Sequence, residues 1–284
     1  MRVVRFSVGD KNYSGVIDKD PKDSEKEIVT ALKGGDIMAC AQAYDELDMT
    51  TGSESWPLGD VKLLAPVLPS KIIGIGLNYA AHAAEFSKDA PQETPLIFMK
   101  PSTAVIGPED DIVLPDHMSH RVDYEGEMGL VIGRRTRNVN LRDAKQNIFG
   151  YTCINDVTAR DLQGKDKLFT RAKGFDTFAP IGPWIETSAE YDFEPTKTRI
   201  ETFLNGERRQ DATALNMMFN IYELISFISK VMTLLPGDVI ASGTPAGVAP
   251  MKAGDRVEVR IGGIGSLFNN VVAGDKDIDS SFKK

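Results

Sequence analysis

The sequence contains little cysteine and lacks any long apolar run. Its two cysteines, Cys40 and Cys153, have no CxxC spacing and are too few for a disulfide framework, so both are expected to be reduced. No stretch reaches the roughly 18 apolar residues that a membrane-spanning helix needs. Residues 1–6 lead into polar residues and not into an apolar leader. A cytoplasmic protein without a membrane partner is therefore expected.

Positive charge is also scarce. The chain has 33 Lys and Arg residues against 41 Asp and Glu residues, a formal net charge of -8, which argues against a general nucleic-acid binder. An anionic small molecule is not excluded, because a bound divalent cation and a few basic side chains can dominate the potential inside a pocket. A chain of 284 residues, 42% of them hydrophobic, is long enough for a large domain and a small one.

Residues 1–65 are expected to form a small N-terminal α+β domain. Residues 3–17 alternate apolar and polar side chains around Gly9 to Asn12, which predicts a β-hairpin. Asp23 or Ser24 is a potential cap for a short helix that ends at Leu32, and a weaker helical pattern covers residues 39–47. Glycine and proline are frequent from residue 52 to residue 69, which places a domain boundary near residue 65 and a second domain over residues 66–284.

The second domain is dominated by short β-type runs divided by glycine and proline. These runs cover residues 71–76, 96–99, 122–133, 149–155, 200–204, 238–242 and 256–261. Asn205-Gly206 predicts a hairpin turn, and one strong helix is expected over residues 221–234, with Asn220 as its cap and Glu223 in the capping-box position. Strands and helices do not alternate, so the pattern favours an α+β class with a mixed or antiparallel sheet and peripheral helices.

Two carboxylates lie two residues apart in the run 122–133. On a strand, Glu125 and Glu127 point to one face and Met128 to the other, and both carboxylates can reach one cation. A solvated face that pairs with lysines is the alternative. The buried run 149–154 ends at Asp156, and the spacing of Asp156, Arg160 and Gln163 places the three on one face of a predicted helix. Three oxygen ligands suit a hard cation, with Mg²⁺ first and Mn²⁺ or Ca²⁺ as alternatives.

Six motifs then carry a resemblance to a known family. They cover residues 74–85, 98–102, 124–129, 155–161, 173–176 and 242–245. Together, over roughly residues 70–272, they resemble the fumarylacetoacetate hydrolase superfamily, similar to its acylpyruvate hydrolases and 2-hydroxyhepta-2,4-diene-1,7-dioate isomerases. The resemblance implies a rolled mixed β-sheet of the C-terminal type, a homodimer, and a Mg²⁺-type site on Glu125, Glu127 and Asp156.

The resemblance also assigns roles to residues that are ambiguous alone. His82 and Glu85 have the i, i+3 spacing of a hydrogen-bonded pair on a helix, which by itself is typical of a surface contact. The family places its catalytic His/Glu dyad on these two positions, its substrate-binding lysine on Lys173, and a substrate contact on Thr244. Arg160 and Gln163 are then expected to bind substrate oxygens.

One difference from the family pattern narrows the range of expected substrates. The longer family members bring a fourth acidic ligand from the region that is apolar here, residues 72–76, so fumarylacetoacetate itself is in doubt. The expected function is metal-dependent hydrolysis of a C–C bond in a small anionic 2,4-dioxo acid of the acylpyruvate or fumarylpyruvate type, through a stabilised pyruvate enolate. An isomerase or decarboxylase on the same site stays open, as does a non-catalytic protein that binds a metal and a carboxylate. The exact substrate is left undecided.

Overall fold

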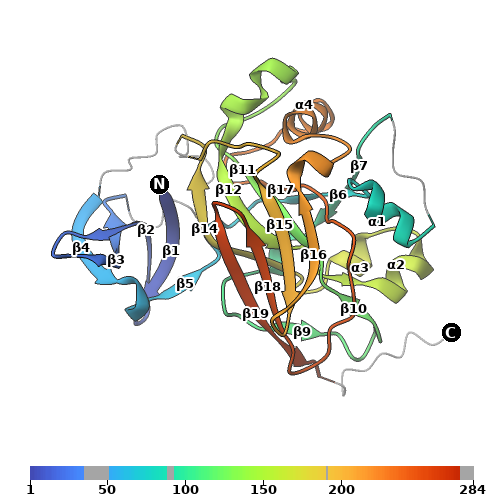
Figure 1. Cartoon of the computed structure of the whole chain (residues 1–284), viewed down its shortest axis with the longest axis horizontal. Coiled ribbons are helices and arrows are strands. Elements are labelled where there is room, and N and C mark those ends of the chain that lie inside the picture. The colour runs from blue at the N-terminus through green and yellow to red at the C-terminus, as the bar shows by residue number, and fades with distance from the viewer. Residues whose placement is uncertain (35–50, 88–92, 190, 276–284) are drawn as a thin grey trace.

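The computed structural model describes residues 1–34, 51–87, 93–189 and 191–275. Figure 1 shows the N-terminal strands at one end of the molecule and three short helices, α1, α2 and α3, at the other. Two β-sheets fill the space between them. None of the helices in these described ranges combines the length and the apolar character that crossing a membrane would demand.

The N-terminal region folds as strands in its described part. These are β1 (Arg2–Val8), β2 (Lys11–Asp20), β3 (Asp23–Leu32), β4 (Thr51–Pro57) and β5 (Lys62–Leu64). The predicted hairpin is confirmed: Val8 pairs with Lys11 across a turn in which Gly9 has a φ of 57°.

The helix predicted to end at Leu32 is wrong, because that segment is strand β3. It pairs with β2, and its alternate residues Val29 and Ala31 are buried in a small cluster with Phe6. Burial on a sheet face therefore overrides the cap-like Asp23. The second predicted helix, residues 39–47, lies outside the described residues.

The larger sheet runs through the whole molecule. Its remaining strands are β6 (Ile72–Gly76), β7 (Leu96–Lys100), β8 (Val105–Ile106), β11 (Gly126–Ile132), β12 (Ile148–Asn155), β14 (Ala179–Thr187) and β17 (Val239–Ala241). The order along its main path is β4-β3-β2-β1-β14-β12-β11-β17-β6-β7. Most pairs are antiparallel, but β17 and β6 are parallel, so the sheet is mixed. Strand β1 of the N-terminal region pairs directly with β14 of the second predicted domain. The predicted domain boundary near residue 65 therefore stays a prediction.

A second sheet covers one face of the first (Figure 1). It has the order β16-β15-β18-β19-β9, formed by β9 (Ile112–Leu114), β15 (Arg199–Leu204), β16 (Glu207–Thr213), β18 (Arg256–Ile261) and β19 (Gly265–Ala273). Met128 and Leu130 of the first sheet pack in one buried cluster with Val259 and Leu267 of the second. The turn at Asn205-Gly206 joins β15 and β16 with φ values of 53° and 80°, as predicted. Two further short strands, β10 (Val122–Asp123) and β13 (Thr158–Ala159), pair with each other close to Glu125 and Asp156 in the chain.

The helices are short and peripheral. They are α1 (Ala80–Glu85), α2 (Arg160–Asp166), α3 (Thr170–Lys173) and α4 (Ile221–Val231), with 3-10 turns at Leu58–Asp60, Ser102–Ala104, Leu141–Asn147 and Ala214–Asn216. The predicted capping box of α4 is confirmed, since Asn220 and Glu223 exchange side-chain and backbone hydrogen bonds. The helix ends at Val231, before the predicted Leu234, because Leu234 pairs with Thr136 as a β-bridge. The α+β class with a mixed sheet and peripheral helices is thus confirmed.

The close approach of β12 and β14 gives a stability prediction. A Cβ added at Gly150 would lie 2.4 Å from the carbonyl oxygen of Glu186 and 2.5 Å from Cγ2 of Ile185. We expect Gly150→Ala to lower the free energy of unfolding by about 1–3 kcal/mol, as overpacking does. The control Gly59→Ala has nothing within 4 Å of the added Cβ and should change it by less than about 0.5 kcal/mol. Chemical denaturation measures both; equal effects would contradict the packing argument.

Candidate metal centre and pocket

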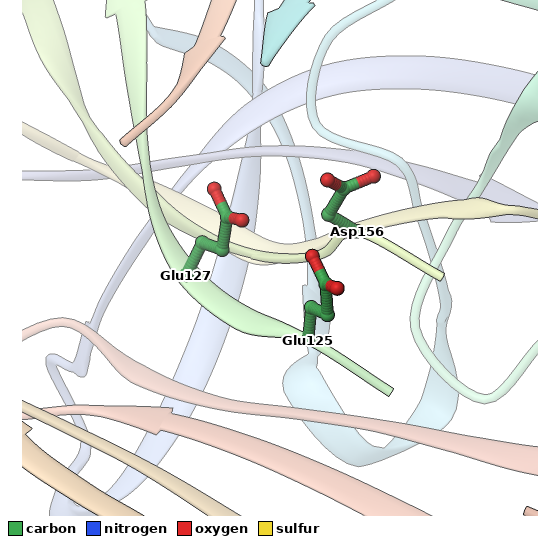
Figure 2. A group of neighbouring side chains, drawn as sticks. All are labelled: Glu125, Glu127 and Asp156. Carbon is green, nitrogen blue, oxygen red and sulfur yellow. The ribbon is translucent and has the colours of Figure 1, made fainter. Parts of the chain in front are cut away.

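Three buried carboxylates lie close together at one end of the paired strands β11 and β12. Glu125 precedes β11, Glu127 lies within it, and Asp156 follows β12. One oxygen from each lies within 4.8 Å of the others. Figure 2 shows the three carboxylate groups directed into one shared space. Glu125, Glu127 and Asp156 are exposed by 4%, 1% and 1%, so solvent does little to reduce their mutual repulsion.

Strand pairing, and not a helix, brings Asp156 to the glutamates. Gly126 pairs with Asn155 in the β11–β12 ladder, and the amide of Asp156 donates to the carbonyl of Glu125 at 2.8 Å. Residues opposite each other in such a ladder point to the same face. Helix α2 begins only at Arg160. The prediction that Asp156 shares a helix face with Arg160 and Gln163 is therefore wrong, although all three belong to one site.

Two buried lysines and one mostly buried arginine pair with two of these carboxylates. The Lys100 ammonium donates to Asp156 Oδ1 at 2.6 Å, and Lys173 bridges Glu125 and Asp156, at 2.7 Å to Glu125 Oε2. Arg160 donates to Glu125 from one terminal nitrogen and to Gln163 Oε1 from the other, at 2.7 Å for Gln163. The structure thus places Lys173, Arg160 and Gln163 beside the predicted metal ligands.

These charges move the pKa values in opposite directions. Burial opposes ionisation of Glu125, but the charges of Lys173 and Arg160 outweigh it and hold its pKa well below the usual range. Burial alone would also lower the pKa of Lys173, yet Asp156 and Glu125 raise it. For Lys100, burial prevails over the attraction of Asp156 and lowers the pKa.

Glu127 is the exception. The backbone amide of Gly243 donates to its Oε2 at 2.7 Å, and among the described residues Glu127 forms no ion pair. Burial first, and then the negative charges of Asp156 and Glu125, raise its pKa well above the ordinary value. A buried carboxylate without a cationic partner, beside two further oxygen donors, fits a hard divalent cation.

A histidine and a glutamate lie at the same pocket. Nδ1 of His82 is 3.0 Å from Oε2 of Glu85, and His82 is 5% exposed. The other carboxylate oxygen, Oε1, accepts from the amide of Gly247 at 2.8 Å. Because Nδ1 faces Glu85, Nε2 is the ring nitrogen left to meet a ligand. The structure therefore forms the pair that the sequence placed on α1.

Polar, charged and apolar side chains line the pocket. Its empty space is about 420 Å³, which includes the open solvent at its mouth. The polar and charged lining residues are His82, Glu125, Glu127, Arg160, Gln163, Lys173 and Thr244, and the larger apolar ones are Ile75, Leu77, Phe86, Phe98 and Phe169. The hydroxyl of Thr244 donates to the carbonyl of Gly126 at 2.9 Å. It therefore has no proton left for a substrate carboxylate, which leaves the Thr244 amide for the predicted contact.

Sequence reasoning missed two groups of the ion-pair network around the carboxylates. Lys100 was part of a family motif, but no role was assigned to it; a lysine that ends an apolar strand was the available signal. Asp123, which accepts from Arg160 Nε at 2.9 Å and from Arg121 Nε at 3.0 Å, precedes the two glutamates with the same two-residue spacing. That spacing could have suggested an acidic strand face with three members.

The comparisons with known proteins agree with this fold. A model of the family described as fumarylacetoacetate (FAA) hydrolase C-terminal matches residues 71–272, and one described as Rv2993c-like, N-terminal, matches residues 1–66. The chain belongs to the fumarylacetoacetate hydrolase family, and it is an enzyme.

Named relatives span more than one reaction. The chain is 41% identical to oxaloacetate tautomerase YisK of Bacillus subtilis over 78% of this chain and 76% of that protein. A structure of 5-carboxymethyl-2-hydroxymuconate delta-isomerase from Mycobacterium smegmatis has a TM-score of 0.83 and 42% identity, covering 96% and 100% of the two chains. A maleylpyruvate hydrolase from Sphingobium sp. SYK-6, in complex with manganese(II) and pyruvate, has a TM-score of 0.79 and 31% identity, covering 97% and 100%.

Glu127→Gln tests the candidate metal centre. Because the pKa of Glu127 is raised in the folded state, the unfolded chain loses this proton first, from about pH 4.5. Without a metal, the wild type should then lose stability as the pH rises from there toward the raised folded pKa. The variant lacks this loss and should be the more stable of the two at neutral pH in EDTA. Thermal unfolding between pH 4 and pH 8 measures the difference.

Added metal should reverse that order. Mg²⁺ or Mn²⁺ that binds only the folded wild type raises its melting temperature, and Glu127→Gln should lose most of this increase. Glu201→Gln is a control, since Glu201 pairs with Arg208 in the second sheet, away from the triad. An unchanged response of Glu127→Gln to Mn²⁺ would remove Glu127 from the metal site.

Proposed function

We propose that the chain is a divalent-metal-dependent enzyme that interconverts the keto and enol forms of a small 2-oxo acid. The observation behind this proposal is that an oriented histidine lines the same pocket as Glu125 and Glu127, two of the three converging carboxylates. Enolisation needs a group that moves one proton and an electrophile that stabilises the enolate. The oxaloacetate tautomerase and the muconate isomerase among the relatives support this reaction.

Glu125, Glu127 and Asp156 would hold the cation, with Mg²⁺ first and Mn²⁺ or Ca²⁺ as alternatives. When bound, it supplies positive charge to the 1-carboxylate and 2-oxo oxygens of the substrate and so favours the enolate. The maleylpyruvate hydrolase structure with manganese(II) and pyruvate supports this assignment.

His82 is the proton-transfer group in this proposal. Glu85 holds Nδ1 of the ring and so fixes its tautomer, which leaves Nε2 as the nitrogen that can exchange a proton. In the enol-to-keto direction His82 protonates C3 while the enol oxygen releases its proton to solvent, and His82 then regains a proton from solvent. Lys173, Arg160 and Gln163 position the substrate oxygens, and the Thr244 amide binds its carboxylate.

His82→Ala should slow the ketonisation of enol oxaloacetate by about 10²–10⁴-fold, the usual contribution of a positioned acid or base. Loss of the enol absorbance, measured with added Mg²⁺ or Mn²⁺, follows the reaction. His120→Ala is a matched control, since His120 also meets a carboxylate, Asp161, at 2.9 Å, but its side chain is 88% exposed. An undiminished rate in His82→Ala would exclude the dyad from the reaction.

Hydrolysis of a C–C bond in a 2,4-dioxo acid, the reaction expected from the sequence, is the second candidate function. The His82–Glu85 pair, in which the histidine is buried, is also suited to activate water for attack on C4, after which the C3–C4 bond breaks, the C4 fragment leaves as a carboxylic acid and pyruvate forms through its enolate. Similarity to the maleylpyruvate hydrolase supports it. Decarboxylation of oxaloacetate would need no attacking water.

Turnover of a small panel separates these reactions. Acetylpyruvate and fumarylpyruvate report hydrolysis, a hydroxy-dienedioate reports isomerisation, and oxaloacetate reports tautomerisation and decarboxylation. With the tautomerase proposal we expect the largest kcat/KM for oxaloacetate ketonisation, and EDTA should abolish it. Inactivity on every member, with metal present, would favour a non-catalytic binder. The homodimer also stays a prediction, which light scattering in solution tests.

A further inference from the structure

One loop touches both halves of the candidate site. This loop, residues 242–248, follows β17 and presents two backbone amides to two different carboxylates. Gly243 donates to Glu127 Oε2 at 2.7 Å, and Gly247 donates to Glu85 Oε1 at 2.8 Å. Glu127 belongs to the triad and Glu85 to the dyad. The loop 242–248 is therefore a physical link between the candidate metal ligands and the histidine pair.

Gln210 fastens this loop from the second sheet. It lies on β16 with its side chain fully buried. Its amide nitrogen donates to Thr244 Oγ1 and to the carbonyl of Pro245, both at 2.7 Å, and its Oε1 accepts from the amide of Gly126 at 3.0 Å. A buried amide is costly unless it is hydrogen-bonded. Here each bond goes to the loop or to Gly126, the residue between Glu125 and Glu127.

Tyr124 fastens the far end of the loop. Its hydroxyl donates to the carbonyl of Gly247 at 2.8 Å, and the residue directly precedes Glu125. Gly247 has a φ of 108°, and a Cβ there would lie 2.0 Å from the carbonyl oxygen of Arg209. The backbone of the loop is thus packed against β16 without space for a side chain.

We propose that Gln210 and Tyr124 are positioning residues which, through the loop 242–248, fix the His82–Glu85 dyad relative to the carboxylate triad. The inference rests on the proposed function in assigning proton transfer to His82. Helix α1 spans only Ala80–Glu85, too short to be stable on its own. The bond from Gly247 to Glu85 therefore anchors the helix that carries the histidine.

Tyr124→Phe removes one hydroxyl and tests the anchor at Gly247. We expect the Mn²⁺ affinity, measured by titration calorimetry, to stay within about twofold, because no bond to the triad is lost. The kcat for oxaloacetate ketonisation should fall about tenfold with little change in KM, and amide hydrogen exchange in residues 80–86 should become faster. Tyr191→Phe is the matched control, since it removes a similar bond to the carbonyl of Gly262, at 2.9 Å.

Gln210→Met keeps the side-chain length but removes the hydrogen bonds both to the loop 242–248 and to the amide of Gly126. We expect it to lower the Mn²⁺ affinity as well, by about tenfold, as loss of groups that orient metal ligands does. A merely structural role would overturn the proposal. It would appear as a fall in melting temperature like that of Tyr191→Phe, while amide hydrogen exchange in α1, the Mn²⁺ affinity and the separate values of kcat and KM all stay as in the wild type.

The two failures can be told apart. If the metal-loaded wild type turns over no substrate of the panel, the proposed function fails, and the assignment of proton transfer fails with it. The link between loop and dyad is still decided by amide exchange and Mn²⁺ binding, which need no turnover. Unchanged exchange in residues 80–86 of Tyr124→Phe would overturn the link even in an active enzyme.

Discussion

The repulsion among three buried carboxylates is the constraint on which this structure depends. Like charges within 4.8 Å, in an interior that water scarcely reaches, are tolerated only with compensating charge. The chain supplies it from three places, with Lys100 at the end of β7, Arg160 at the start of α2 and Lys173 at the end of α3. Glu127 lacks such a partner in the described chain, and a divalent cation would complete the balance.

The sheet architecture makes that arrangement possible. The β11–β12 ladder sets Glu125 opposite Asp156, and β17, the neighbour of β11 on its other side, leads into the loop that meets Glu127. The second sheet contributes Gln210 from β16. Rigid strands hold the carboxylates, whereas the histidine lies on the short helix α1, which the bond from Gly247 to Glu85 ties to the loop 242–248. The proposed mechanism therefore depends on this loop to keep His82 in place against the carboxylates.

Several reactions in one family are compatible with one such site. The enolate of a 2-oxo acid is common to tautomerisation, isomerisation, decarboxylation and hydrolysis, and in the proposed mechanism the three carboxylates and their cations serve that shared species. In the proposed mechanism, these reactions differ in whether His82 moves a proton at carbon or activates water. The aromatic residues that line the pocket, Phe86, Phe98 and Phe169, lie outside β11 and β12.

The sequence by itself determined the local features, which depend on residues close together in the chain. The hairpins at Gly9 and Asn205, the cap of α4 and the pairing of His82 with Glu85 follow from turn geometry, capping and helical spacing, and the family motifs placed the triad. Only the tertiary structure decided that residues 23–32 form a strand, that Asp156 reaches Glu125 through sheet register, and that Lys100 and Gln210 belong to the site. The reason is physical: sheet pairing and ion pairing join residues tens of positions apart, and no local period encodes which ones meet.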